Sequence, residues 1–179
     1  MILLAVAGQA QQEPSYKELP NFHKVSDTLY RGGQPTSAGA AKLAELGIET
    51  IINLRGEEDV DREGQKQAEA AGLRYFNVPM PGLSAPSDEQ IARVIKLIDD
   101  PENQPVFIHC KRGADRTGTV AAIYRIKHEG WTSERAIGEA KRHGMSWAEF
   151  GMRSYISNYY KAQVLLRDKS TAAATATSR

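Results

Sequence analysis

The single cysteine of the chain, Cys110, lies where residue types and spacing predict chemistry. An apolar run after Pro105 is typical of a buried strand, and this strand ends at Cys110. A short loop with Gly113 follows, and Arg116 and Thr117 then lead into an apolar helical pattern. A strand, a loop and a helix start aim backbone N–H groups and a helix N-terminus at one point, which makes an anion-binding site.

The residue types of this loop favour attack by sulfur on a phosphate. A helix N-terminus and nearby cations lower the pKa of a thiol from about 8.5 to about 3.5–7.5 and so produce the nucleophilic thiolate. Arg116 has a planar set of donors that matches two phosphate oxygens. The loop amides can bind the other oxygens and stabilise their charge in the transition state. Thr117 can donate a hydrogen bond to the departing sulfur, and His109 can brace the loop through its ring nitrogens.

The string HCKRGADRTG, at positions 109–118, resembles the signature loop of the cysteine-dependent protein tyrosine phosphatase superfamily. The size of the chain resembles the compact dual-specificity branch, and the resemblance covers about residues 24–162. It implies phosphomonoester hydrolysis through a phosphocysteine intermediate, with Cys110 as the nucleophile, Arg116 as the phosphate clamp and Thr117 beside the sulfur. The loop residues that this resemblance places on the substrate are Lys111, Arg112, Gly113, Ala114 and Thr117.

The general acid is the point at which the sequence departs from this family. Phosphatases of this type place an aspartate about thirty residues before the cysteine, but no aspartate lies between Arg62 and Ser87. Asp115 occupies a loop position to which the acid role is assigned in similar lipid and bacterial phosphatases, and we predict that it is the acid. Its alternative role is as a structural partner of an arginine or a backbone amide. Asp88 is the second candidate, although it follows a helix N-cap, where it complements the helix dipole.

The substrate class stays open at this point. Lys111 directly after the cysteine matches phosphoinositide 3-phosphatases, which have a second lysine where this chain has Ala114. Lys111 and Arg112 make the mouth basic, which suits a phosphotyrosine peptide, a phospholipid headgroup or an inositol phosphate. The main prediction is a protein tyrosine or dual-specificity phosphatase, and the alternative is a phosphoinositide or inositol phosphate phosphatase. A pseudophosphatase is disfavoured, because Cys110 and Arg116 are both present. A rhodanese-like sulfurtransferase or an arsenate reductase is disfavoured by the Arg-Thr-Gly exit of the loop and by its position late in the chain.

Length and composition exclude several other classes of protein. The chain has 179 residues, a net charge of +1 and one cysteine. This length is typical of one domain, and the net charge predicts neither nucleic-acid binding nor a polybasic membrane patch. A single cysteine excludes an intramolecular disulfide. The histidines are scattered, so we expect no metal and no cofactor, and we expect a monomer.

The order of elements predicts the fold class. Strands and helices alternate, which is typical of an α/β fold: a single domain with a central, mostly parallel sheet and helices on both faces. The signature loop then lies at the carboxyl end of a strand, where open α/β sheets bind ligands. We expect strands within residues 21–35, 48–54, 73–78 and 106–110. We expect helices that begin at Thr36 or Ser37, near residue 65, at Ser87 with a capping box, after Arg116, at Thr132 or Ser133, and at Ser146.

Several residues near these elements carry specific expectations. Arg31 lies in Tyr-Arg-Gly-Gly-Gln-Pro, which resembles the first-strand exit of small bacterial phosphatases. We expect an exposed turn arginine, and a place near the site is the alternative. Residues 55–64 are expected to form a solvated loop. Residues 79–86 are the counterpart of the mobile acid-bearing loop of the family. The aromatic residues of the last helix are expected in the core, and they are Trp147, Phe150, Tyr155, Tyr159 and Tyr160.

The termini are expected to lie outside the phosphatase domain, which spans 21–166. Residues 1–20 form an N-terminal tail, and its apolar start resembles the late part of a secretory signal peptide with cleavage after Ala10, but without a basic n-region. We therefore predict a periplasmic or secreted protein, with the cytoplasm as the alternative. Residues 167–179 are rich in Ser, Thr and Ala, and we expect a disordered tail.

Overall fold

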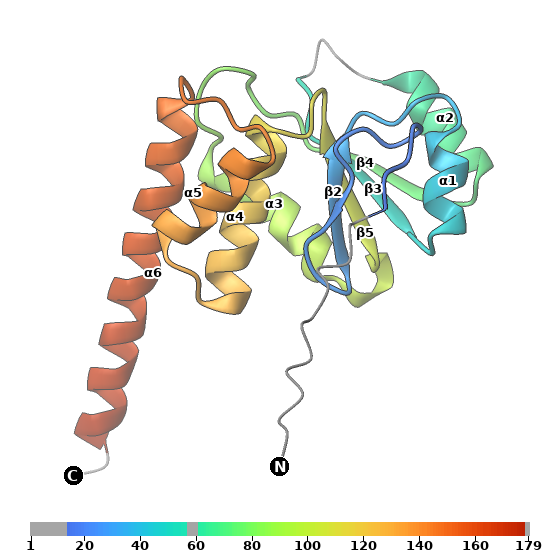
Figure 1. Cartoon of the computed structure of the whole chain (residues 1–179). Coiled ribbons are helices and arrows are strands. Elements are labelled where there is room, and N and C mark those ends of the chain that lie inside the picture. The colour runs from blue at the N-terminus through green and yellow to red at the C-terminus, as the bar shows by residue number, and fades with distance from the viewer. Residues whose placement is uncertain (1–13, 57–60, 178–179) are drawn as a thin grey trace, which may run out of the picture.

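The computed structural model describes residues 14–56 and 61–177, which form a five-stranded sheet between two groups of helices (Figure 1). The strands are β1 (His23–Lys24), β2 (Leu29–Gly33), β3 (Thr50–Asn53), β4 (Arg74–Asn77) and β5 (Val106–Cys110). The helices are α1 (Gly39–Glu45), α2 (Arg62–Ala70), α3 (Asp88–Asp99), α4 (Asp115–Glu129), α5 (Ser133–Arg142) and α6 (Phe150–Thr177).

The strand order is β1-β2-β5-β3-β4, and only the short β1 runs antiparallel to its neighbour. This confirms the predicted α/β fold with a mostly parallel sheet. β5 lies at the centre, where Gly33 of β2 pairs with Cys110 and Asn53 of β3 pairs with His109. The carboxyl ends of three parallel strands therefore meet at the cysteine, which is the edge at which such sheets bind ligands.

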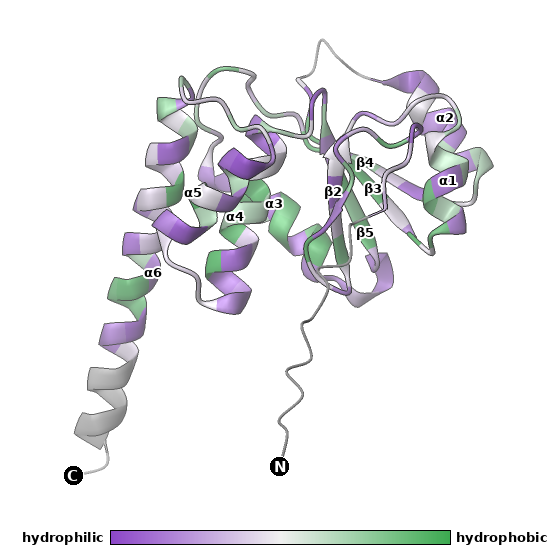
Figure 2. Ribbon diagram, viewed as in Figure 1, coloured by the Kyte–Doolittle hydropathy of each residue, from purple (hydrophilic) through white to green (hydrophobic). Residues whose placement is uncertain are grey.

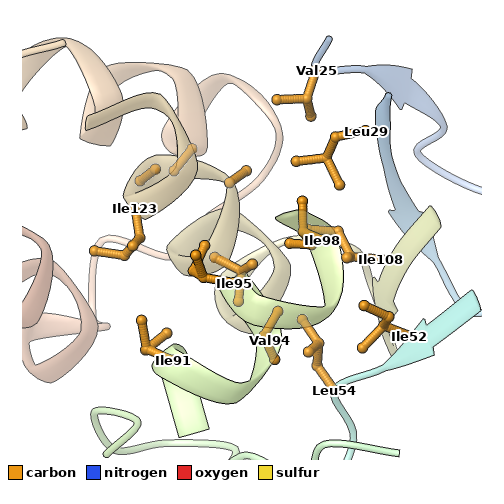
Figure 3. Packing of buried hydrophobic residues seen from close by; sticks show 14 of the residues in the cluster. Val25, Leu29, Ile52, Leu54, Ile91, Val94, Ile95, Ile98, Ile108 and Ile123 are labelled. Atoms are coloured by element: carbon orange, nitrogen blue, oxygen red, sulfur yellow. The ribbon is translucent and has the colours of Figure 1, made fainter. Parts of the chain in front are cut away.

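Helices cover both faces of the sheet, as predicted. Alternate residues of a strand point to opposite faces, so Ile108 joins the core under α3–α6 while Phe107 joins the smaller core under α1 and α2. Figure 3 shows Val94 and Ile98 of α3 next to Leu54 and Ile108 of the strand side. Figure 2 shows the same division as hydrophobic residues in the central strands and on α3. This packing fixes the end of β5, and so the position of Cys110.

The capping box predicted at Ser87 is confirmed. Ser87 Oγ accepts a hydrogen bond from the Gln90 N–H at 3.2 Å, and Gln90 Oε1 accepts one from the Ser87 N–H at 2.8 Å. The cap expected for α1 at Thr36 or Ser37 is wrong, because its N-cap is Ala38 and no side chain caps it. The Gly39 N–H donates to the Thr36 carbonyl in a turn instead.

The last helix differs from the prediction at both ends. It begins at Phe150 instead of Ser146, and it continues to Thr177, through most of the stretch from residue 167 for which we expected a disordered tail. The stretch contains alanines and no glycine or proline, and these features favour a helix over a coil. In Figure 1 the second half of α6 extends past the other helices.

Two predictions concern residues that the structure does not describe. The apolar start up to Ala10 lies outside the described residues, so export stays a prediction. Residues 57–60 of the charged loop lie outside them as well, and the chain is described again from the N-cap of α2, Asp61. Among the described helices, none combines the length and apolar character needed to cross a bilayer.

Candidate active site

The signature loop, which we define as residues 110–117, joins β5 directly to α4. The N-cap of α4 is Ala114, and no side chain caps this helix start. The N–H groups of the first turn therefore remain available to an anion at the loop. This is the strand, loop and helix start predicted from the sequence.

Gly113 allows the loop to pass close to the neighbouring strand. Its φ is +69°, in the left-handed region that favours glycine. A Cβ at this position would lie 2.3 Å from the carbonyl carbon of Gly32 and 2.4 Å from the nitrogen of Gly33. The positive φ and the close approach to β2 both require glycine at this position. Gly113 of the predicted site therefore determines the shape of the loop.

The environment of Cys110 favours the thiolate. The residue is 3 % exposed, and this burial raises its pKa. The hydroxyl and amide of Thr117, the charge of Arg116 and the amide of Gly113 act in the opposite direction and prevail, so the pKa is lowered overall. Thr117 Oγ1 is buried and has no other hydrogen-bond partner in the structure, which is consistent with its predicted place beside the sulfur.

Arg116 lies at the open side of the loop. It is half-buried, and its Nη1 donates to the Met80 carbonyl at 3.4 Å, so the predicted clamp also contacts the segment 79–86. Lys111 and Arg112 are exposed at the mouth, as a basic entrance requires. The loop therefore combines a thiolate at its base with three cationic side chains around it.

Asp115 makes the contacts of its alternative, structural role. One carboxylate oxygen accepts from Arg112 Nη2 at 2.5 Å, and the other accepts from the Ser146 N–H at 2.8 Å. To act as an acid, Asp115 must carry a proton and Arg112 must move away, so that role stays a prediction. Asp88 accepts from the Tyr155 hydroxyl at 2.7 Å in a groove between α3 and α6 that no signature-loop residue lines.

Arg31 is a functional residue that the sequence analysis placed wrongly. It is 1 % exposed, not an exposed turn residue, and its Nη2 donates to the Gly113 carbonyl at 2.8 Å. Burial lowers the pKa of Arg31 to about 10, against the charges of Glu139 and Cys110, so it remains a cation at neutral pH. The reason is its position in β2, inside the sheet, where it pairs with Ile108 of β5.

Asn21 and Arg31 together brace the loop from below. The Asn21 side-chain amide donates to the carbonyls of Arg112 at 3.1 Å, Gly113 at 3.2 Å and His143 at 3.0 Å. No sequence signal pointed to Asn21. His109 was expected to brace the loop through its ring, and that role stays a prediction; the ring is buried, and the Cys110 backbone acts to raise its pKa. Burial lowers the pKa of His109 to about 4, so the ring is neutral at neutral pH.

With this geometry in place, comparison with known proteins decides the family. The family model described as "DSP-PTPase phosphatase fused to NAD+ Kinase" matches residues 11–158, which is most of the chain. The chain belongs to this DSP-PTPase family. The resemblance that the signature loop indicated therefore extends over the strands and helices on both sides of it.

Relatives of this DSP-PTPase chain carry two kinds of name. The dual specificity protein phosphatase TpbA of Pseudomonas aeruginosa is 32 % identical over 125 residues, which are 69 % of this chain and 55 % of that protein. The inositol diphosphatase DSP3 of Arabidopsis thaliana is 29 % identical over 134 residues, which are 72 % of this chain and 65 % of that protein. The chain thus spans a little over half to about two thirds of the length of these relatives.

A solved structure agrees with the fold. The core catalytic domain of the PP-IP phosphatase SIW14 from S. cerevisiae superposes with a TM-score of 0.71 at 26 % identity, covering 79 % of this chain and 86 % of that one. The DSP-PTPase chain therefore shares its fold with this catalytic domain over most of both chains.

Proposed function

We propose that this chain hydrolyses phosphomonoesters through a phosphocysteine intermediate and that its substrates are phosphorylated proteins, as in a tyrosine or dual-specificity phosphatase. The observation that carries the proposal is the environment of Cys110: a thiol with a lowered pKa at an uncapped helix start, beside Arg116. A buried structural cysteine would have a raised pKa, because burial disfavours the thiolate.

In the first step, the Cys110 sulfur attacks the phosphorus, and the bond from phosphorus to the ester oxygen breaks. The leaving oxygen takes a proton, which we assign to Asp115. Arg116 and the N–H groups at the start of α4 bind the three remaining phosphate oxygens and stabilise the charge spread over them. The product alcohol or phenol leaves, and the phosphoryl group remains on sulfur.

In the second step, water attacks the phosphorus, its proton passes to the Asp115 carboxylate, which restores the acid, and the bond from phosphorus to sulfur breaks. Inorganic phosphate leaves, and the sulfur returns to the thiolate. The hydroxyl of Thr117 lowers the pKa of the Cys110 thiol, so it stabilises the departing thiolate and speeds this step.

A second candidate substrate is an inositol phosphate. Exposed Lys111 and Arg112 at the mouth favour a ligand with several phosphates. The names of DSP3 and SIW14 refer to inositol diphosphates and PP-IP, which supports the same class. The name of TpbA supports phosphoprotein substrates equally, so the two substrate classes have to be separated by comparing their turnover.

The test measures phosphate release from three substrates in the presence of EDTA: p-nitrophenyl phosphate, a phosphotyrosine peptide and an inositol polyphosphate. We expect turnover of the first two and a higher kcat/KM for the peptide than for the inositol polyphosphate. Turnover of the inositol polyphosphate alone would transfer the proposal to the second candidate. No release from any of the three would leave a phosphate-binding protein without catalysis.

A further inference from the structure

Exposed apolar side chains concentrate next to the candidate active site. Among the described residues, the most exposed large hydrophobic side chains are Leu83 at 88 %, Trp147 at 76 % and Phe150 at 63 %. We call these three residues the apolar rim. The next two, Leu165 and Leu166, are each 60 % exposed and lie far along α6. The sequence analysis expected Trp147 and Phe150 in the core, and that expectation is wrong.

Both segments that carry the rim are held against the signature loop. The segment of Leu83 is joined to it where Arg116 Nη1 donates to the Met80 carbonyl at 3.4 Å. The segment of Trp147 is joined to it where the Ser146 N–H donates to Asp115 at 2.8 Å. The two segments also meet each other, since a Cβ on Gly151 would lie 3.2 Å from the Ala85 nitrogen. Figure 1 shows both connections, green and orange, at the end of the sheet where the loop lies.

The two aromatic rings of the rim are held in one arrangement while they remain exposed. The rings of Trp147 and Phe150 make an edge-to-face contact with centroids 6.4 Å apart. The Arg153 guanidinium lies 4.6 Å from the Phe150 ring centroid and donates to the Trp147 carbonyl at 2.6 Å. A fixed ring loses little conformational freedom when a ligand covers it, so these contacts prepare the rim for binding.

The charge around the rim indicates what kind of ligand would cover it. Lys111 and Arg112 are exposed at the mouth, and Arg153 lies within the rim. A matching ligand has a phosphate for the loop and an apolar group beside it. An inositol polyphosphate is anionic all round and offers no such group. A bilayer would match a larger apolar surface with a polybasic cluster, whereas this chain has a net charge of +1 and a rim of three side chains.

We propose that the apolar rim binds an apolar side chain next to the phosphorylated residue of a protein substrate. The rim thereby selects phosphoproteins by their local sequence. This inference rests on the proposed protein phosphatase function and assigns the specificity of that site to Leu83, Trp147 and Phe150.

The experiment compares two phosphotyrosine peptides of equal length and net charge, one with leucines beside the phosphotyrosine and one with serines. For the wild-type chain we expect a kcat/KM about tenfold higher for the leucine peptide, because covering a leucine side chain removes apolar surface from water. The double variant Trp147→Ala/Phe150→Ala should bring this ratio close to one. The matched control Leu165→Ala/Leu166→Ala removes equally apolar surface elsewhere and should keep the wild-type ratio.

The ratio compares two substrates of one enzyme sample, so a general loss of activity cancels. Should the double variant fail to fold, Leu83→Ser on the other segment makes the same test. Equal turnover of both peptides by the wild type, or an unchanged ratio in the rim variants, would overturn the inference alone. No thiol-dependent release from either peptide would overturn the proposed protein substrate as well.

A membrane surface would give a different result. If the rim variants lose binding to vesicles of phosphatidylcholine and phosphatidylserine and the peptide ratio stays the same, the rim is a bilayer contact and the inference is wrong. The supporting outcome is a changed peptide ratio with no vesicle binding by the wild type.

Discussion

Two regions flank the signature loop: the apolar rim and a floor, which we define as Arg31 and Asn21. The floor and the rim are built from opposite kinds of contact. Beneath the signature loop, Arg31 and Asn21 turn polar groups toward loop carbonyls, and Arg31 is almost completely buried. Beside the loop, Trp147 and Leu83 leave apolar surface in water. The hydrogen bonds from Arg31 Nη2 and the Asn21 amide hold the loop carbonyls in place, so the floor positions the loop for chemistry. A ligand that covers the rim removes its apolar surface from water, which favours binding, so the rim is suited to selecting substrates by their side chains.

The largest effect should come from Arg116→Lys in the signature loop, which the floor supports. Lysine keeps the charge but loses the planar pair of donors, so we expect kcat for p-nitrophenyl phosphate to fall about 100- to 1000-fold, as for the loss of one donor to a developing anion. KM should change less than kcat. Arg93→Met, on the exposed side of α3, is the control for a lost arginine and should leave both constants near wild type. A near-normal kcat for Arg116→Lys would mean that Arg116 is only structural.

The next largest effect should come from Asp115, which connects the signature loop to the segment of Trp147 by accepting a hydrogen bond from the Ser146 N–H. If Asp115 is the acid, Asp115→Asn should slow phosphotyrosine about 100-fold more than p-nitrophenyl phosphate, whose leaving group needs little protonation. The alkaline side of the pH profile should also flatten. Equal slowing of both substrates would show that Asp115 only holds Arg112 and residue 146 in place. A selective loss in Asp88→Asn would assign the acid to α3 instead.

Arg31→Met tests whether the floor matters beyond stability. The variant removes the donor to the Gly113 carbonyl, and a hydrogen bond from a charged donor is worth about 1.5–3 kcal/mol, so we expect kcat/KM to fall about ten- to a hundredfold. The thermal unfolding midpoint separates this effect from unfolding. A variant that is folded at the assay temperature and turns over at the wild-type rate would contradict a positioning role for Arg31.

The smallest effect should come from Thr117→Val. The Thr117 hydroxyl lowers the pKa of the Cys110 thiol, so its removal raises that pKa and leaves less thiolate at a given pH. The acid side of the kcat/KM profile should therefore move to higher pH, while activity on the plateau falls only a few-fold. Iodoacetamide alkylation of Cys110 against pH measures the same shift directly. An unmoved profile would mean that the hydroxyl does not act on the sulfur.

The chemistry of the signature loop could be predicted from the sequence because it depends on neighbours in the chain. Cys110, Gly113 and Arg116 belong to one continuous strand, loop and helix start. Their spacing in the sequence therefore determines how they are arranged in space. The alternation of strands and helices likewise predicted the mostly parallel sheet. Arg31 could not be placed in the same way, because its burial depends on β5, about seventy-five residues later in the chain, as its register with Ile108 shows.

The rim could not be predicted for a different reason. Trp147 and Phe150 share the apolar spacing of Tyr155 and Ile156, and a helical period assigns all four to the core. The helix begins only at Phe150, so Trp147 lies in the preceding connection, and the helical period does not apply to it. Because one helical periodicity was applied to both the connection and the helix, exposed side chains were assigned to the core.

The central claim is that Cys110 carries the phosphoryl group during turnover. The direct measurement quenches the reaction with acid in the steady state and maps the added mass of one phosphoryl group by peptide mass spectrometry. We predict that it lies on the peptide containing Cys110 and is absent after the same treatment of Cys110→Ser, which should still bind vanadate. A phosphoryl group on another residue, or turnover by the serine variant at more than a few per cent of the wild-type rate, would contradict this account.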